Sequence, residues 1–441
     1  MAAQLLAKPL DPDKPYFGNP LMNKVDTAFK DDRKLTYLNS EGADKPLISP
    51  VPDAVLDDAR AYRLGRFRDQ MAKRDVAALL LYDPINIRYA FDSSNMQIWT
   101  THNPMRYAMI LADGPAILWE FKGCEHLNDG LPGIDEVRTA ISWMFMSKGD
   151  KAEGSIGPWA DELAALVREH GGGNTRIAVD KLDPPGLVAL EERGLTYVEG
   201  TELTEIARVI KSPSEIELMR WTIRVCEAGI ARIYDHSVPG ATERELWAHL
   251  HFENARSGGD WLETKLLTCG SHTNPWYKEC SDRVCALGEM ISFDTDMIGP
   301  YGYCADLSRS WTCGYTPMND TQKRLYATAR DQIEHNLALV VPGMSYAEYN
   351  AKSWRIPAGH VDYRYSLALH GVGMADEYPV VPLHVDFDEK TAMSGHLEPG
   401  MVVCVESLIA EVGSESIKLE TQVLITETGH ERLDSFPWED V

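Results

Sequence analysis

The sequence predicts an α+β protein in which a smaller α/β domain is followed by a larger domain of strands and helices. The chain has 441 residues, which is enough for two domains. Apolar runs of strand type alternate with helical patterns over residues 54–210, as is typical of α/β domains. Beyond about residue 264 the pattern changes to strands and turns. We therefore expect an extended arm at 1–53, the α/β domain at 54–210 and the second domain at 211–441.

The arm is predicted from its proline content. Prolines recur there among polar residues, a composition that suits extended chain better than a core element. They are Pro9, Pro12, Pro15, Pro20, Pro46, Pro50 and Pro52. Arms of this kind often pack on a partner subunit.

The α/β domain is predicted from a succession of short elements. Residues 54–74 have a helical pattern, and residues 76–82 form a continuous apolar run typical of a buried strand. The turn Asp113-Gly114 separates two further apolar runs, at 107–111 and 116–119, which predicts a hairpin. The remaining elements are a helix at 158–170, a strand at 176–180, a helix at 185–192 and a strand at 196–198.

A long helix is predicted to open the second domain. Ser212 can cap this helix, Pro213 suits its first turn, and Glu215 completes a capping box. One apolar face follows, formed by Ile216, Met219, Ile223, Cys226, Ile230 and Ile233. Further helices are expected from about residue 242, over 320–337 and near 345–354.

Composition limits the classes of partner. The chain has 43 Lys and Arg against 67 Asp and Glu, a formal net charge of −24, which opposes binding to nucleic acid or an anionic lipid surface. The sequence has no run of about 18 apolar residues, so we expect no membrane span. The eight cysteines form no CxxC pair. They suggest reduced thiols and a cytoplasmic location.

Three aspartates lie in an apolar segment of the second domain. Asp294 and Asp296 are two residues apart, so on a strand they share a face. Burying like charges is unfavourable unless a cation compensates, and a metal ion can do so. A Gly-Pro-Tyr-Gly turn can bring Asp306 beside the first two carboxylates. This trio fits a metal site, although a solvated acidic turn explains the same residues.

Three later residues favour the metal interpretation. His370 lies in a His-Gly-Val-Gly segment whose glycines allow close backbone approach. Glu406 lies on one apolar strand and Glu420 on another. Carboxylates that point inward require partners. Together with the three aspartates, these residues are the ligand types of a carboxylate-rich binuclear site for divalent ions.

These motifs resemble the superfamily of methionine aminopeptidases, prolidases and creatinases. The resemblance rests on residues 210–220, the Asp294 to Asp306 segment, His370-Gly-Val-Gly, Leu397-Glu-Pro-Gly-Met-Val and Glu420. It implies a pita-bread metallopeptidase-like fold for the second domain and a creatinase-type fold for the first. It also implies a homodimer.

The resemblance implies a set of metal ligands. These are one of Asp294 or Asp296, or both, together with Asp306, His370, Glu406 and Glu420. The choice is open because Asp306 follows Asp294 by 12 residues and Asp296 by 10, and the superfamily's spacing lies between these values. Such a ligand set suits manganese, iron, cobalt or zinc.

Two positions depart from the peptidases of the superfamily. Trp276 stands where they carry a histidine before a tyrosine, and Asp376 stands where they carry a second histidine. Because both histidines serve peptide hydrolysis, their loss indicates a different reaction. The pattern resembles the dimethylsulfoniopropionate lyases of the DddP type. That resemblance implies iron as the metal and cleavage of a small zwitterionic substrate to dimethyl sulfide and acrylate.

We assign roles for such an elimination to four residues. Asp376 is the candidate base, and an apolar aromatic setting would raise its pKa toward the working range. Trp276, Tyr365 and Trp99 are candidates to hold the sulfonium by cation–π contact, with core packing as the alternative for each. Two other functions are weighed. One is a prolidase- or creatinase-type hydrolase of a dipeptide or amidine, and the other is a non-enzymatic binding module, which predicts eroded metal ligands.

Overall fold

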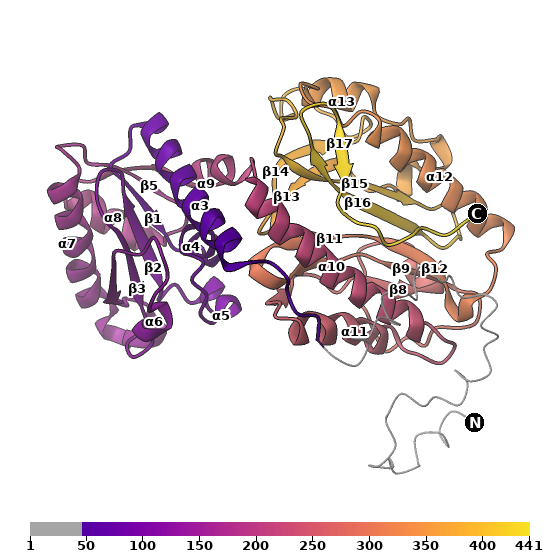
Figure 1. Ribbon diagram of the computed structural model, residues 1–441, viewed down its shortest axis with the longest axis horizontal. Helices are drawn as coiled ribbons and strands as arrows, with labels where there is room; N and C mark the ends of the chain where they lie inside the picture. The colour runs from indigo at the N-terminus through magenta and orange to yellow at the C-terminus, as the bar shows by residue number, and fades with distance from the viewer. Residues whose placement is uncertain (1–45) are drawn as a thin grey trace, which may run out of the picture.

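The computed structural model describes residues 46–441 (Figure 1). Most of the predicted arm lies outside the described residues, and residues 46–52 have no regular secondary structure. In the described part of the chain, no helix is both long and apolar enough to cross a membrane.

The amino-terminal half contains a mixed six-stranded sheet with the order β4-β3-β2-β1-β5-β6. Its strands are β1 (Ala78–Leu81), β2 (Tyr107–Leu111), β3 (Ala116–Glu120), β4 (Glu136–Thr139), β5 (Arg176–Val179) and β6 (Thr196–Glu199). The central strand β1 runs antiparallel to β2 and parallel to β5. Every residue of β1 is buried, which explains its unbroken apolar sequence.

Helices cover both faces of this sheet. They are α3 (Asp53–Arg74), α4 (Pro84–Phe91), α5 (Gln97–His102), α6 (Phe145–Lys148), α7 (Ala152–His170), α8 (Pro184–Glu192) and α9 (Thr201–Arg208). Figure 1 shows α7 and α8 on the outer side and α3 and α9 on the side toward the rest of the molecule. Helix α3 packs on α9, α4 and α10, so it belongs to the contact between the two halves.

The carboxy-terminal half is built from small sheets between two helical layers. Helices α10 (Pro213–His236) and α11 (Glu243–Arg256) lie on one side, and α12 (Asp320–Leu337) and α13 (Tyr346–Lys352) on the other (Figure 1). Two three-stranded sheets have the orders β11-β10-β7 and β12-β9-β8, and a five-stranded sheet has the order β14-β13-β15-β16-β17.

The strands of this half are short except β13, β14, β15 and β16 of the five-stranded sheet. They are β7 (Trp261–Leu262), β8 (Leu267–Cys269), β9 (Met290–Phe293), β10 (Asp296–Ile298), β11 (Cys304–Asp306), β12 (Arg309–Thr312), β13 (Leu367–Val372), β14 (Asp376–Pro382), β15 (Val402–Ile409), β16 (Ile417–Ile425) and β17 (His430–Arg432). Helix α12 packs on β15 and β16 over an apolar cluster that includes Leu325, Ile333, Val405 and Leu419.

The predicted fold class is confirmed, and most predicted elements are present. Helix α12 has the predicted bounds, and both capping boxes of α10 and α11 are formed. Helix α7 begins at Ala152, six residues before the predicted start at Pro158, so Pro158 lies inside the helix rather than in its first turn. The division at residue 210 falls between α9 and α10, and we propose it as the domain boundary.

One expectation about strand geometry is wrong. Asp294 and Asp296 were predicted on one continuous strand, but β9 ends at Phe293 and β10 begins at Asp296. The two strands belong to different three-stranded sheets, so the chain changes sheets at Asp294 and Thr295. The two aspartates therefore lie in different surroundings.

Candidate metal centre and active site

Five strands bring the predicted ligands together. Asp296 and Asp306 are directly opposite each other in the antiparallel β10–β11 pair. Glu406 and Glu420 are directly opposite each other in the β15–β16 pair. His370 lies on β13, the other neighbour of β15. Cross-strand register thus places residues that are distant in sequence within reach of one another.

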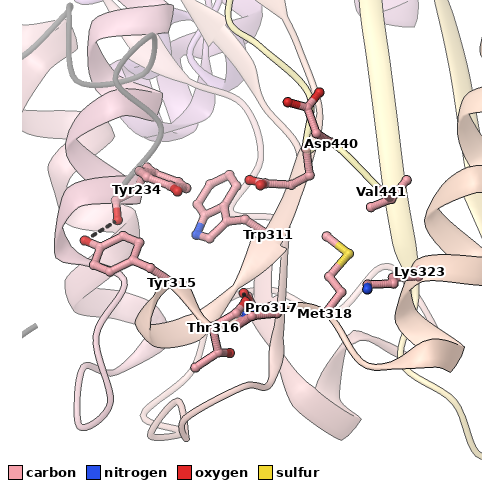
Figure 2. A pocket seen from close by; sticks show the side chains of 11 residues that line it. Tyr234, Trp311, Tyr315, Thr316, Pro317, Met318, Lys323, Asp440 and Val441 are labelled. Carbon is pink, nitrogen blue, oxygen red and sulfur yellow. Dashed lines mark hydrogen bonds between the residues drawn. The ribbon is translucent and has the colours of Figure 1, made fainter. Parts of the chain in front are cut away.

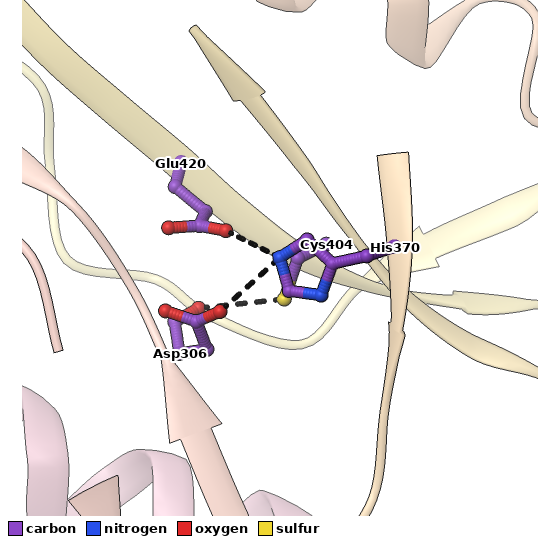
Figure 3. Close-up of side chains that lie close together, drawn as sticks. All are labelled: Asp306, His370, Cys404 and Glu420. Atoms are coloured by element: carbon purple, nitrogen blue, oxygen red, sulfur yellow. Dashed lines mark hydrogen bonds and ion pairs between the residues drawn. The ribbon is translucent and has the colours of Figure 1, made fainter. Parts of the chain in front are cut away.

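The imidazole of His370 lies at the centre of one group. Its Nε2 is 3.2 Å from Glu420 Oε1, 3.4 Å from Asp306 Oδ2 and 3.6 Å from Glu406 Oε1. The thiol of Cys404 is also there, since ligand atoms of Asp306, His370, Cys404 and Glu420 all lie within 4.8 Å of one another (Figure 3). A nitrogen and several carboxylate oxygens therefore converge on one small region.

A second group adjoins the first. Ligand atoms of Asp296, Asp306 and Asp376 also lie within 4.8 Å of one another. Asp306 belongs to both groups, so its carboxylate lies between two candidate cation positions. Asp306 is therefore the residue that the two groups share.

Asp294 has partners of its own. Its Oδ1 accepts a hydrogen bond of 2.6 Å from Ser308, and its Oδ2 is 3.2 Å from Lys418 Nζ. Lys418 Nζ also contacts Glu406 Oε2 at 2.9 Å and Glu420 Oε2 at 3.1 Å. The ammonium therefore holds the oxygens of Glu406 and Glu420 that do not face His370, leaving the Oε1 atoms on the His370 side.

The protonation behaviour of the cluster reflects burial among like charges. Burial raises the pKa of Asp294 to about 6 and that of Glu406 to about 8, although Lys418 opposes both shifts. Burial also raises the pKa of Asp306, and the carboxylate of Glu420 adds to the effect. Burial would raise the pKa of Glu420 too, but Lys418 and His370 hold it below its ordinary value.

This donor set fits divalent cations. Asp294, Asp306, Glu406 and Glu420 are buried and Asp296 is partly buried, whereas Lys418 and His370 are the cationic partners described for them. The Oε1 atom of Glu406 is buried without a hydrogen-bond partner among the described residues. Carboxylate oxygens with one imidazole suit hard or borderline divalent ions, which would neutralise the excess negative charge.

Asp376 lies at the start of β14, beside this cluster. Its Oδ1 is 3.8 Å from His370 Nδ1, and half of its side-chain surface is exposed. A cavity of about 520 Å³ is lined by Asp376, His370 and Tyr365, with residues of α9 on another wall. Partial burial and the nearby Glu420 raise the pKa of Asp376, while His370 opposes the shift. A carboxylate with a raised pKa at a cavity next to a candidate cation site can serve as a base.

The three predicted aromatic residues lie in different places. The ring centre of Tyr365 is 4.9 Å from Lys418 Nζ and 5.6 Å from the ring centre of Tyr277. Trp276 is largely buried, and its Nε1 has no hydrogen-bond partner among the described residues. Trp99 lies on α5 in edge contact with Phe121 of the amino-terminal half. Neither Trp276 nor Trp99 lines the cavity that contains Asp376 and Tyr365.

Sequence reasoning missed four residues of this region. They are Ser308, Lys418, Cys404 and Tyr277. Lys418 and Cys404 each lie two residues before a predicted ligand, Glu420 and Glu406, so period-two spacing was the available signal. Tyr277 is 60% exposed and has a positive φ of 70°, which the sequence does not reveal.

A separate cavity of about 240 Å³ has a different lining. Figure 2 shows Trp311, Tyr315 and Met318 around it, with Lys323 and the carboxylate of Asp440 nearby. It contains none of the predicted site residues, so we assign the chemistry to the carboxylate cluster.

Comparison with known proteins gives the family. Residues 217–427 match the metallopeptidase family M24. The chain is 41% identical over 396 residues to the dimethylsulfoniopropionate lyase DddP of Roseovarius nubinhibens, covering 88% of each chain. It is also 41% identical over 398 residues to the DddP of Roseobacter denitrificans, again with 88% of each chain covered.

Solved structures show the fold. The Xaa-Pro dipeptidase from Bacillus anthracis superposes with a TM-score of 0.69 at 20% identity, covering 86% of this chain and 99% of that one. The prolidase from Pyrococcus horikoshii gives a TM-score of 0.69 at 18% identity, with 86% and 99% covered. The chain therefore has the prolidase fold and belongs to the family of DddP dimethylsulfoniopropionate lyases.

Proposed function

We propose that this protein is a metal-dependent lyase that cleaves dimethylsulfoniopropionate to dimethyl sulfide and acrylate. The observation that carries the proposal is the position of Asp376. A half-exposed carboxylate lies beside the carboxylate–histidine cluster, at a residue where the peptidases of the superfamily carry a histidine. The identity to two DddP lyases over 88% of the chain supports the same reaction.

We propose two divalent ions as the cofactor, with iron favoured over manganese, zinc or cobalt. Asp306, His370, Glu406 and Glu420 would hold one ion, and Asp296 and Asp306 the other. Asp294 is a further candidate ligand through the oxygens that now contact Ser308 and Lys418. When bound, the ions would supply Lewis-acid polarisation of the substrate carboxylate.

The residues of this chain account for the remaining steps. Asp376 takes a proton from the carbon next to the substrate carboxylate, and the C–H electron pair becomes the new C=C bond. The C–S bond breaks, and its electron pair leaves with sulfur as neutral dimethyl sulfide. Tyr365 faces the same cavity and is suited to hold the sulfonium by cation–π contact. Trp276 and Trp99 do not line this cavity, so the same role stays a sequence-based expectation for these two residues.

The oligomeric state and the location of the enzyme are also proposals. We propose a homodimer, as the resemblance to creatinase-type enzymes implies, and light scattering of the purified protein tests this. We propose a cytoplasmic location, supported by eight cysteines that are all free thiols.

A second candidate is a hydrolase of a dipeptide or small amidine. The match to metallopeptidase family M24 and the prolidase fold favour it. Trp276 and Asp376 weigh against it because they replace the two histidines that serve peptide hydrolysis in the superfamily.

The test is an assay of the purified, metal-analysed protein with dimethylsulfoniopropionate. Dimethyl sulfide in the headspace and acrylate in solution are measured, with a chelated sample and an Xaa-Pro dipeptide in parallel. Equal amounts of both products, lost on chelation, are expected. Turnover of the dipeptide without release of dimethyl sulfide would instead establish the hydrolase.

A further inference from the structure

A chain of buried polar contacts leads from the amino-terminal sheet to the turn that carries Asp376. Asp180, directly after β5, accepts hydrogen bonds of 2.8 and 3.1 Å from the backbone amides of Tyr82 and Asp83, directly after β1. It also accepts one of 3.0 Å from Asn86 Nδ2. The Oδ1 atom of Asn86 in turn accepts a hydrogen bond from Arg208, the last residue of α9.

Arg208 continues this chain into the carboxy-terminal half. Its Nε is 3.3 Å from Glu377 Oε1, and Lys211 Nζ is 3.4 Å from Glu377 Oε2. The three side chains are at most 6% exposed. Burial would raise the pKa of Glu377, but Lys211 and Arg208 hold it below its ordinary value. Glu377 is therefore a buried carboxylate whose charge depends on two cations from the segment between the halves.

Glu377 and Glu205 fix the backbone on either side of Asp376. Glu377 Oε1 accepts a hydrogen bond of 2.8 Å from the amide of Met374, and Glu205 Oε2 accepts one of 3.0 Å from the amide of Tyr378. Arg208 also pairs with Glu205. The half-exposed side chain of Asp376 lies between these two anchored amides. The conformation of the turn therefore determines where the side chain of Asp376 lies.

We propose that Arg208 is a positioning residue for the base: through Glu377 and Glu205 it fixes the β13–β14 turn, so the amino-terminal half determines where Asp376 lies. The inference rests on the proposed function, because it takes Asp376 as the base. Loss of the guanidinium weakens the pairing of the buried Glu377 and the partly buried Glu205, and the turn has to rearrange to solvate the Glu377 carboxylate. A displacement of about 1 Å at a reacting group can cost about 100-fold in rate.

The test is Arg208→Met, assayed in the metal-loaded enzyme and by amide hydrogen exchange over residues 374–378. We expect a fall in kcat of about 10- to 100-fold, a KM within about twofold of the wild type, unchanged metal content and faster exchange in the turn. Arg208→Lys keeps the charge and is expected to recover part of kcat. Glu377→Gln, which keeps the size of the side chain, is expected to give the same pattern if Arg208→Met folds poorly.

The matched control is Arg106→Met. Arg106 forms an equally buried ion pair of 2.7 Å with Glu120, but this pair lies within the amino-terminal half. Its loss is expected to lower Tm without changing kcat or exchange in the turn. Wild-type kcat in folded Arg208→Met, or equal losses of kcat in both variants, would overturn the proposal. Hydrogen exchange does not need lyase activity, so a wild-type protein that releases no dimethyl sulfide would refute the proposed function separately.

Discussion

Asp296 and Asp306 are direct cross-strand partners at the start of β10 and the end of β11, and Asp306 also lies 3.4 Å from His370. One carboxylate therefore connects the two groups of candidate ligands. In the β10–β11 pair, Asp306 lies opposite Asp296. Asp294 instead contacts Ser308 and Lys418. The account of the metal centre depends on this bridging position.

Asp306→Asn is expected to remove metal from both positions. The amide keeps the shape of the side chain but loses the charge that two cations would share, so metal affinity should fall by more than the roughly 10- to 100-fold seen for outer-shell partners. Metal analysis by inductively coupled plasma mass spectrometry measures this. Asp282→Asn, at an exposed carboxylate, is the control. Two full equivalents of metal in folded Asp306→Asn would contradict the bridging role.

Tyr365→Leu is expected to weaken substrate binding. If the ring holds the sulfonium, its loss costs about 0.5–2 kcal/mol, which corresponds to a KM increase of roughly 2- to 30-fold. Tyr365→Phe keeps the ring, so its KM should stay near the wild-type value. Steady-state kinetics with dimethylsulfoniopropionate separate the two variants, and equal KM values for both would exclude the cation–π contact.

The substitution Asp434→Asn is expected to make the free energy of unfolding less sensitive to a fall in pH. Burial would raise the pKa of Asp434, but Arg309 at 2.6 Å and Arg432 at 2.8 Å hold it below its ordinary value. A carboxyl with a depressed folded pKa stabilises the protein above its unfolded pKa of about 3.9, and this contribution is lost as pH falls through the folded pKa.

The neutral-pH cost of breaking this buried pair should be about 3–5 kcal/mol in the free energy of unfolding. Denaturant titrations between about pH 7 and pH 3 should show the difference between wild type and Asp434→Asn shrinking below about pH 4. A difference that stays constant over this range would show that the ion pair is not its source.

The sequence predicts the local elements of this fold better than their junctions. Helix α12 is readily predicted, because its cap at Asn319 and its apolar spacing are local signals. The break between β9 and β10 is not predictable in this way. A strand that changes sheets at Asp294 has the same period-two pattern as a continuous strand, and only the positions of β8 and β11 distinguish them.

Some residues of the candidate site are likewise predictable from local sequence, and others are not. The carboxylates and His370 stand out in the sequence because charged groups on apolar strands need partners. Lys418 does not stand out, because its role depends on tertiary contacts: the β15–β16 register brings it near Glu406, and its ammonium also contacts Ser308, which lies between β11 and β12. The contacts of Arg208 with Glu377 span 169 residues between two halves of the chain, a distance over which sequence spacing carries no information.

The central claim is that Asp376 removes the substrate proton, and Asp376→Asn tests it most directly. The variant is assayed for dimethyl sulfide and acrylate after its metal content and fold have been matched to the wild type, with Asp388→Asn as an exposed carboxylate control. The account predicts that release of both products falls by about 100- to 10,000-fold in Asp376→Asn and is unchanged in the control. Turnover close to the wild type in folded, metal-replete Asp376→Asn would contradict it.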